Sequence, residues 1–300
     1  MEKAVINKIL VPLDYSETSG NALTLAVDLS RRYNASIHLL HIVKSYQCIS
    51  ISENGLLIDF SKEAIKAAER KRLRRLADEV TDNQSHACTV ECCVGNDTSN
   101  VIVEATVANE SDLIIMGQGT SGIMDFFRSS ETYDVVKAAP CPVLTIPAHW
   151  QAGKFKKILF PVRSVEGALE KYELTKRLIL DNNAQLTVLG LYNEETPQKD
   201  EDLTELLSTL EHQLQQDKIK AGIELVNTDE AADRVLFKSR QAEADLIIIT
   251  ADYEQTAGGF FVDPYARQII DQATVPVLAI RPQPFVVHMQ PMHSSQTAMA

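Results

Sequence analysis

The chain has 300 residues, of which 45% are hydrophobic and 23% are charged, and its formal net charge is -12. This is the composition of a globular protein, so collagen-like, mucin-like and wholly disordered chains are excluded. The 41 acidic residues outnumber the 29 basic ones, which argues against a protein that wraps nucleic acid, because such proteins need a basic surface. The length allows one large domain or two of about 150 residues.

The N-terminus and the cysteines indicate the compartment. The chain begins MEKAVINKILVPLD, without the apolar core and small-residue cleavage site of a signal peptide. No apolar run approaches the ~20 residues that span a bilayer. The five cysteines form an odd number without a framework spacing, which fits reduced thiols. We therefore expect a cytoplasmic protein with no membrane partner and no nucleic-acid partner.

Strands and helices alternate along the first half of the chain. Short apolar runs predict strands at residues 8–13, 36–43, 87–94, 112–116 and 143–146. Helical spacing of apolar residues predicts helices at residues 16–32, 60–80, 98–108 and 130–138. Ser16 is a suitable N-cap for the first of these helices. Continuous apolar strands separated by helices are typical of a parallel sheet covered on both faces.

The second half of the chain repeats the first. KILVPLD recurs as KILFPVR at an offset of 149 residues, DLII recurs at an offset of 133, and PVL recurs at an offset of 134. Ordered matches at a near-constant offset indicate a duplicated unit. We therefore expect an α/β chain of two tandem, doubly wound, parallel five-stranded sheets, with domains at residues 1–150 and 151–285. Residues 286–300 have no periodicity and are expected to form a flexible tail.

Two loops of the first unit are candidate sites, because ligands of doubly wound sheets bind where the strand order reverses. Asp14 follows the first strand, where a carboxylate can hold a ribose hydroxyl or cap the next helix. Residues 117–122, GQGTSG, follow the fourth strand, where glycine backbone N–H groups can approach a phosphate or simply form a turn. This is not a dinucleotide fingerprint, which should follow the first strand, nor a P-loop, because no Gly-Lys-Ser/Thr follows.

Taken together, these motifs resemble the universal stress protein family. The resemblance rests on an ordered set: DYSET after ILVP, the strand end IIMG, the downstream Ser129-Ser130, and the segment APCPV. It covers the first unit fully and the second more weakly, as in the tandem type that has two such domains on one chain. It implies an adenine-nucleotide-binding α/β fold that dimerises. Here it implies an internal pseudo-dimer, and it leaves a further homodimer open.

The resemblance also implies which residues would bind the nucleotide, ATP or another adenine nucleotide, with or without Mg²⁺. Those at the adenosine end are Pro12, Leu13, Asp14 and Ile42, and those at the phosphate end are Met116, Gly117, Gly119, Ser129, Ser130 and Glu131. The chain departs from the family signature at two points. Only Gln118 separates the first two glycines, where the family has two residues, and Ser129 replaces a glycine. A Cβ at that position narrows the approach of a phosphate.

The second unit departs further from this pattern. Arg163 stands in place of Asp14, Asp252 and Glu254 lie in the turn after the fourth strand, and Asp263-Pro264 stands in place of the two serines. Carboxylates repel phosphate, and proline removes an N–H group that could face it. We therefore expect the second domain to be a non-binding partner of the first.

No catalytic residue and no metal ligand is predicted. An evident Lys or Arg clamp for phosphoryl transfer is missing from the motifs, and His86, Cys88 and Cys92 are spaced too widely along a strand for one zinc ion. The basic residues at 70–75 fit the solvated face of an amphipathic helix. The sequence thus favours a stress-response regulatory protein that binds ATP. A nucleotide-free scaffold, a binder of a small apolar ligand, and a slow ATPase or autophosphorylating protein stay open as alternatives.

Overall fold

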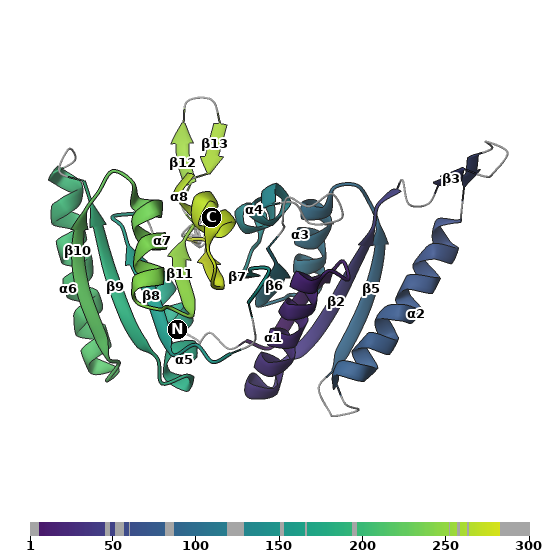
Figure 1. Ribbon diagram of the computed structural model, residues 1–300, viewed down its shortest axis with the longest axis horizontal. Helices are drawn as coiled ribbons and strands as arrows, with labels where there is room; N and C mark the ends of the chain where they lie inside the picture. The colour runs from purple at the N-terminus through teal and green to yellow at the C-terminus, as the bar shows by residue number, and fades with distance from the viewer. Residues whose placement is uncertain are drawn as a thin grey trace, which may run out of the picture.

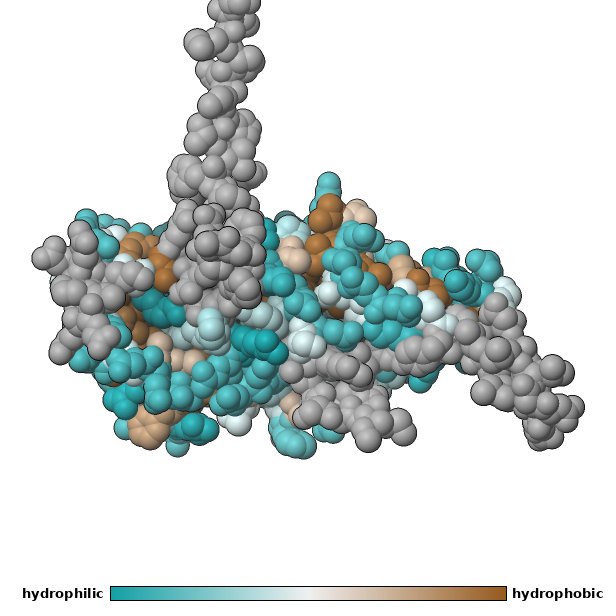
Figure 2. Space-filling model, turned by 90° about the horizontal axis from the view of Figure 1, so that it is seen from above, coloured by the Kyte–Doolittle hydropathy of each residue, from teal (hydrophilic) through white to brown (hydrophobic). Residues whose placement is uncertain are grey.

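A ten-stranded sheet with helices on both faces forms the body of the protein (Figure 1). The computed structural model describes residues 6–45, 49–51, 57–59, 61–81, 87–118, 129–150, 153–165, 167–193, 197–251, 253–256, 259–262 and 264–282. No helix in these ranges is long and apolar enough to cross a bilayer. Seen from above, polar side chains cover most of the described surface, and hydrophobic ones form small patches (Figure 2).

The N-terminal half of the sheet consists of five parallel strands. Its elements are β1 (Lys8–Leu13), α1 (Glu17–Tyr33), β2 (Ser36–Val43), α2 (Lys62–Thr81), β5 (Cys88–Val94), α3 (Thr98–Ala108), β6 (Leu113–Gly117), α4 (Ser129–Ala138) and β7 (Val143–Ile146). The strands lie in the order β7-β6-β1-β2-β5. The chain moves outward from β1 to β2 and β5 and then returns to the other side of β1 as β6. The strand order therefore reverses between β1 and β6, as the sequence predicts.

The C-terminal half repeats this order in its own five strands. Its elements are β8 (Lys157–Val162), α5 (Glu170–Asp181), β9 (Gln185–Tyr192), α6 (Pro197–Gln216), β10 (Ala221–Asn227), α7 (Ala231–Gln241), β11 (Leu246–Thr250), α8 (Pro264–Gln272) and β14 (Val277–Ile280). The strands lie in the order β10-β9-β8-β11-β14. The reversal here falls between β8 and β11, the counterparts of β1 and β6.

Two hairpins lie outside the main sheet, where the sequence predicts only connections. β3 (Ile49–Ile51) and β4 (Leu57–Asp59) pair antiparallel between β2 and α2. β12 (Tyr253–Thr256) and β13 (Gly259–Val262) pair antiparallel between β11 and α8 and project from the sheet (Figure 1). Such short ribbons carry too few alternating residues to stand out from a loop in the sequence.

The two halves join edge to edge through their closing strands. β7 and β14 pair antiparallel, with Leu144 opposite Leu278, so the expected α/β fold is confirmed and its two five-stranded sheets merge into one. Across this seam the Gln118 amide donates to the Ile270 carbonyl, and Thr145 Oγ1 donates to the Val277 carbonyl at 3.4 Å. Each closing strand is paired on both sides, so a second copy of the chain cannot add to the sheet there.

The alternation of side chains along the strands builds two core layers. Ile9 and Val11 pack with α1, α2, α5 and α6 on one face, whereas Leu10 packs with α3, α4, α7 and α8 on the other. The repeated DLII motif has a structural role within this frame. Asp112 accepts hydrogen bonds from the backbone N–H of Asn7 and Lys8 at 2.8 and 2.9 Å. Asp245 does the same for the residues that begin β8.

Candidate functional site

The carboxyl ends of β1 and β6 meet at the reversal of the strand order. Leu10 pairs with Ile114, and the same register brings the end of β1 level with Gly117. A Cβ on Gly117 would lie 2.6 Å from Thr18 Oγ1 and 2.8 Å from the Thr18 backbone carbon. The first turn of α1 therefore packs directly on the Gly117 backbone, and a side chain here would force two backbone segments apart. This contact brings the β1–α1 turn and the end of β6 together.

Asp14 organises the β1–α1 turn rather than capping the helix itself. Its Oδ1 accepts hydrogen bonds from the Ser16 backbone N–H at 3.0 Å and from the Ser16 hydroxyl at 2.5 Å. Ser16 is the N-cap, and its Oγ accepts from the Ser19 N–H at 3.2 Å. Both bonds to Asp14 fall on Oδ1, and within the described part of the chain no donor reaches Oδ2. A half-buried carboxylate oxygen is thus available to a ligand hydroxyl.

Tyr15 adopts a left-handed backbone conformation, with φ of 64°, which costs roughly 1–2 kcal/mol for a residue with a Cβ. Three contacts hold it there. Its hydroxyl donates to Glu69 Oε2 at 2.9 Å, the Arg72 guanidinium lies 3.5 Å from the ring centroid, and the His41 ring lies 4.7 Å away. Burial and the Glu69 carboxylate raise the pKa of Tyr15, so the hydroxyl remains a donor.

These contacts clamp α2 onto the end of β1. The sequence predicts a solvated face for the basic residues 70–75, and Arg72 is indeed largely exposed, yet its guanidinium stacks on Tyr15. His41 completes the arrangement from β2, because its Nδ1 donates to the Leu13 carbonyl at 2.7 Å. Its Nε2 lies 3.9 Å from Glu69. Tyr15, the residue after Asp14, is therefore held by side chains from two elements, α2 and β2.

Lys44 supplies a cation that the sequence motifs do not reveal. It follows β2 directly and is only 9% exposed. Its Nζ donates to the Asn96 carbonyl at 3.2 Å and to the Thr98 hydroxyl, and it pairs with Glu131 Oε1 at 3.1 Å. A lysine one residue past a strand that neighbours the reversal point is the only signal in the sequence. The Lys44 ammonium at the predicted phosphate end is therefore ion-paired with Glu131, which is itself one of the predicted site residues.

Comparisons with known proteins agree over the N-terminal half. Residues 6–147 match the model of the universal stress protein family. Universal stress protein YxiE of Bacillus subtilis is 24% identical over 148 residues, which is 47% of this chain and 99% of that protein. A universal stress protein of Methanocaldococcus jannaschii is 27% identical over 143 residues, 46% of this chain and 81% of that protein. Residues 6–147, just under half of the chain, therefore form a domain of the universal stress protein family.

A solved structure extends the likeness in fold to both halves. The crystal structure of a universal stress protein from Archaeoglobus fulgidus superposes with a TM-score of 0.71 and covers 93% of this chain and 99% of that chain. The two sequences are 15% identical, so this likeness concerns the fold alone. The predicted family and fold class are thus both confirmed.

The predicted binding residues of the universal stress protein domain differ in what they can offer a ligand. The side chains of Leu13, Ile42 and Met116 are fully buried in the two core layers. Of the others within the described residues, Pro12 and Gly117 are buried, Asp14 and Glu131 are half-buried, and Ser130 is exposed. Gly119 and the side chain of Ser129 lie outside the described residues. The described polar groups of the candidate site are therefore those of Asp14, Ser130, Glu131 and Lys44.

The corresponding place in the C-terminal half contains different chemistry. Arg163 stands where Asp14 does, and its guanidinium lies 4.1 Å from the ring centroid of Tyr265. Lys171, the counterpart of Ala22, is 2% exposed, donates from Nζ to the Pro161 carbonyl and lies 4.5 Å from the Phe160 ring centroid. Burial, with a smaller contribution from Arg163, lowers the pKa of Lys171 to about 7.

Other predicted features of the second unit are only partly visible. Thr250 stands in place of Gly117, and its buried hydroxyl has no hydrogen-bond partner within the described part of the chain. Asp252, Asp263 and the side chain of Glu254 lie outside the described residues.

In the cysteine-rich strand of the first unit, His86 also lies outside the described residues. Burial raises the pKa of Cys88 and of Cys92 to about 11, so both thiols stay protonated near neutral pH.

Proposed function

We propose that this universal stress protein binds an adenine nucleotide, ATP, at the carboxyl ends of β1 and β6 and acts as a regulatory protein in the stress response. In this proposal residues 1–150 form the binding domain. Residues 151–285 form a second domain that binds no nucleotide and stabilises the first across the β7–β14 seam. No catalytic step is assigned to either domain.

One observation carries the proposal: the first turn of α1 packs on Gly117, so that the Asp14 carboxylate and the end of β6 meet where the strand order reverses. Asp14 Oδ2 is an acceptor suited to a ribose hydroxyl. The N-terminus of α4 carries the exposed Ser130 next to Glu131, and backbone N–H groups at a helix N-terminus favour phosphate. Lys44 lies at the same helix N-terminus, where it pairs with Glu131 at 3.1 Å.

The contrast between the halves supports a single site. At the C-terminal counterpart, a cationic side chain replaces the ribose-binding carboxylate, and Lys171 fills the space under the end of β8 with its own donor to Pro161. A nucleoside would have to displace a fully buried side chain. The binding role therefore falls to the N-terminal half alone.

Calorimetric titration of the full chain with ATP and Mg²⁺ tests the proposal. We expect one site per chain, and we expect Asp14→Asn to weaken binding at least tenfold. Asparagine keeps an acceptor for Ser16 but loses the charge and places an amide at the second oxygen position. The matched control is Arg163→Gln in the other half, which should leave the affinity unchanged.

The outcome separates ATP binding from the remaining alternatives. Absence of heat at high protein concentration would support a nucleotide-free scaffold and overturn the proposal. Equal losses for Asp14→Asn and Arg163→Gln would place the nucleotide elsewhere. Phosphate release in the presence of ATP that Asp14→Asn abolishes would add an ATPase activity to the site.

A further inference from the structure

A cavity of about 840 Å³ lies at the seam between the halves, away from the proposed nucleotide site. It is bounded by the residues that precede three strands of the N-terminal half: Asn7 before β1, Ser111 and Asp112 around the start of β6, and Pro142 before β7. Asp14 and Gly117 stand at the opposite ends of β1 and β6. The volume falls within the range of about 300–1,000 Å³ that small-molecule sites occupy.

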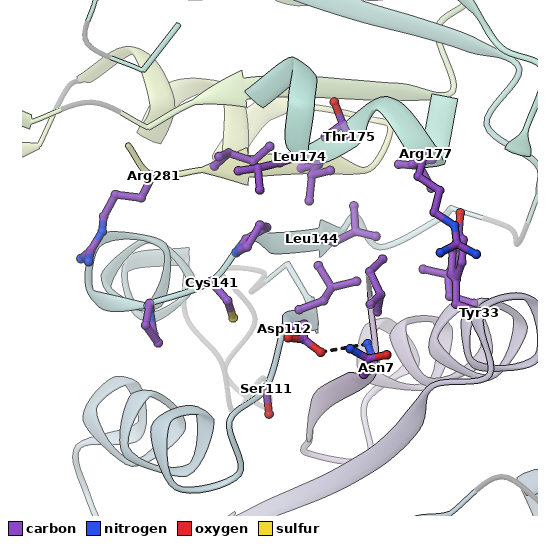
Figure 3. Close-up of a pocket in the computed structure, with 18 residues that line it drawn as sticks. Asn7, Tyr33, Ser111, Asp112, Cys141, Leu144, Leu174, Thr175, Arg177 and Arg281 are labelled. Atoms are coloured by element: carbon purple, nitrogen blue, oxygen red, sulfur yellow. Dashed lines mark hydrogen bonds between the residues drawn. The ribbon is translucent and has the colours of Figure 1, made fainter. Parts of the chain in front are cut away.

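The floor and walls of this cavity are mainly aliphatic. Leu113, Leu144, Leu278 and Ile280 come from the central strands, Leu29 comes from α1, and Leu174 and Leu178 come from α5. Several of these are repeat counterparts, such as Leu29 with Leu178 and Leu144 with Leu278, so the duplication itself lines the cavity from both halves. In Figure 3 the labelled Leu144 and Leu174 face each other across it.

Leu174 exposes apolar surface to the cavity. Its counterpart in the first half, Leu25, is 1% exposed, whereas Leu174 is 39% exposed. The two residues hold the same position on equivalent helices, α1 and α5. The difference therefore comes from what covers them, and an apolar group in the cavity would remove the remaining leucine surface from water.

Two guanidinium groups mark opposite ends of the cavity (Figure 3). Arg281 donates from Nη1 to the Lys137 carbonyl at 3.1 Å. Arg177 lies with its guanidinium carbon 5.3 Å from the Tyr33 ring centroid, and its Nε is 3.5 Å from Asp181. Among the described lining residues Asp112 is the only carboxylate, and its Oδ2 accepts hydrogen bonds from two backbone N–H groups. An aliphatic chamber with cations at its ends suits a ligand with an apolar chain and an anionic head.

We propose that the seam cavity binds a free long-chain carboxylate, with its acyl chain between α1 and α5 and its carboxylate at an arginine of the rim. The aliphatic lining matches an acyl chain. The positive charge of the two arginines matches an anionic head group. Both halves contribute lining residues, so the site exists only because the closing strands join. It is independent of the proposed ATP site.

Fluorescence titration of the full chain with dansylaminoundecanoic acid, followed by displacement with dodecanoate or dodecanol, tests this site. We expect saturable binding of micromolar order and displacement by dodecanoate at least tenfold better than by dodecanol. Arg177→Gln or Arg281→Gln should remove that preference, depending on which end holds the carboxylate. Saturating ATP should leave the probe bound, and displacement of the probe by ATP would overturn the assignment to a separate site.

Leu174→Glu and Leu225→Glu form the matched pair of chain variants. Leu225 lies on the edge strand β10 and is 57% exposed, so Leu225→Glu should bind the probe as the parent does, whereas Leu174→Glu should weaken binding at least tenfold. Both positions are exposed, and unchanged melting temperatures would show that both variants fold. Equal binding by the two variants, or no saturable binding by the parent, overturns the proposal. Co-sedimentation with phosphatidylglycerol vesicles without dodecanoate binding would assign the cavity to a membrane lipid and also overturn it.

Discussion

The two halves of the protein have the same strand order but opposite chemistry at the ends of equivalent strands. In the first half, β1 leads to Asp14, and α1 places the small Ala22 in its buried face. In the second half, β8 leads to Arg163, and α5 places Lys171 at the position that corresponds to Ala22, against the Pro161 carbonyl. The framework of apolar strands tolerates both arrangements, because the differing residues lie at strand ends and helix starts.

The comparison shows how a duplicated fold separates binding from support. The strands and the paired aspartates that tie their starts are kept in both copies. The changes fall at the reversal of the strand order, where they alter charge and free volume without altering the sheet. In the proposed function the second copy then contributes its closing strand to the seam and fills its own site.

Replacing the buried lysine of the second half should have the largest effect on stability. The pKa of Lys171 is lowered from its ordinary value of 10.5 to about 7 in the folded protein. Between pH 7 and pH 10.5 the unfolded chain therefore binds more protons than the folded protein. The stability of the parent therefore rises with pH from about 7 to 10.5, and the full cost of charging Lys171 applies below pH 7. Lys171→Met should gain about 3 kcal/mol at pH 6 and progressively less toward pH 10.

Denaturant unfolding of the parent and of Lys171→Met at pH 6 and pH 10 measures this difference. Lys154→Met, at an exposed lysine, is the control and should change stability by the same small amount at both pH values. If Lys171→Met gained the same stability at both pH values, the burial of Lys171 would not be opposing its protonation. A loss at pH 6 would mean that its bond to Pro161 outweighs its burial.

Filling the glycine position of the first half should destabilise it and abolish nucleotide binding. Gly117→Val places carbon atoms within 3 Å of the Thr18 backbone, so α1 must move, at a cost of about 2–3 kcal/mol. The counterpart Thr250→Val removes a buried hydroxyl that has no partner in the described residues, so it should be neutral or slightly stabilising. Calorimetric melting and ATP titration of both variants measure these effects. Equal melting temperatures and equal ATP affinities for Gly117→Val and Thr250→Val would contradict the proposed difference between the halves.

The hydrogen bonds across the seam should contribute less. Gln118→Ala removes the donor to the Ile270 carbonyl and leaves that buried acceptor unsatisfied, which should cost about 1–2 kcal/mol. Thr145→Val removes a longer bond of 3.4 Å and should cost less than about 0.5 kcal/mol. Equilibrium unfolding monitored by circular dichroism gives both values. The reverse ranking would show that Gln118 does not couple the halves.

Loosening the Tyr15 contacts should have a smaller effect than Gln118→Ala. Tyr15→Phe loses the hydrogen bond to Glu69, which should cost about 1 kcal/mol, and should weaken ATP binding a few-fold because the turn beside Asp14 becomes less constrained. Tyr172→Phe in the other half loses a comparable bond to Asp217. It should lower the melting temperature similarly without changing ATP affinity. An equal change in affinity for both variants would remove the link between Tyr15 and the site.

Much of the fold follows from local patterns. The spacing of apolar residues predicts β1, β2, α3 and β7 with the bounds observed, and Ser16 is the N-cap as expected. The hairpins are missed, because strands of three or four residues are too short to leave a periodic signal. The joining of two sheets into one is also missed, because the pairing of β7 with β14 depends on edges that only exist once both halves have folded.

The candidate site divides in the same way. The residues at the ends of the first and fourth strands can be named from their place in the chain, because the ends of parallel strands converge at one edge of the sheet. The residues that contact them cannot be named from the sequence in this way. Lys44 reaches Glu131 across 87 residues of sequence, and Arg72 covers Tyr15 from a different helix. Such contacts require the packing of α2 and α4 against the sheet.

The sequence by itself determined the duplication, the α/β class and the family, because strand periodicity, repeat offsets and turn motifs are written in neighbouring residues. Only the tertiary structure decided that the halves share one sheet, that Lys171 is buried under the end of β8, and that a leucine-lined cavity lies at the seam. The shared sheet and the cavity arise where residues more than a hundred positions apart meet, and the burial of Lys171 depends on how α5 packs against the end of β8. No local pattern in the sequence sets these contacts.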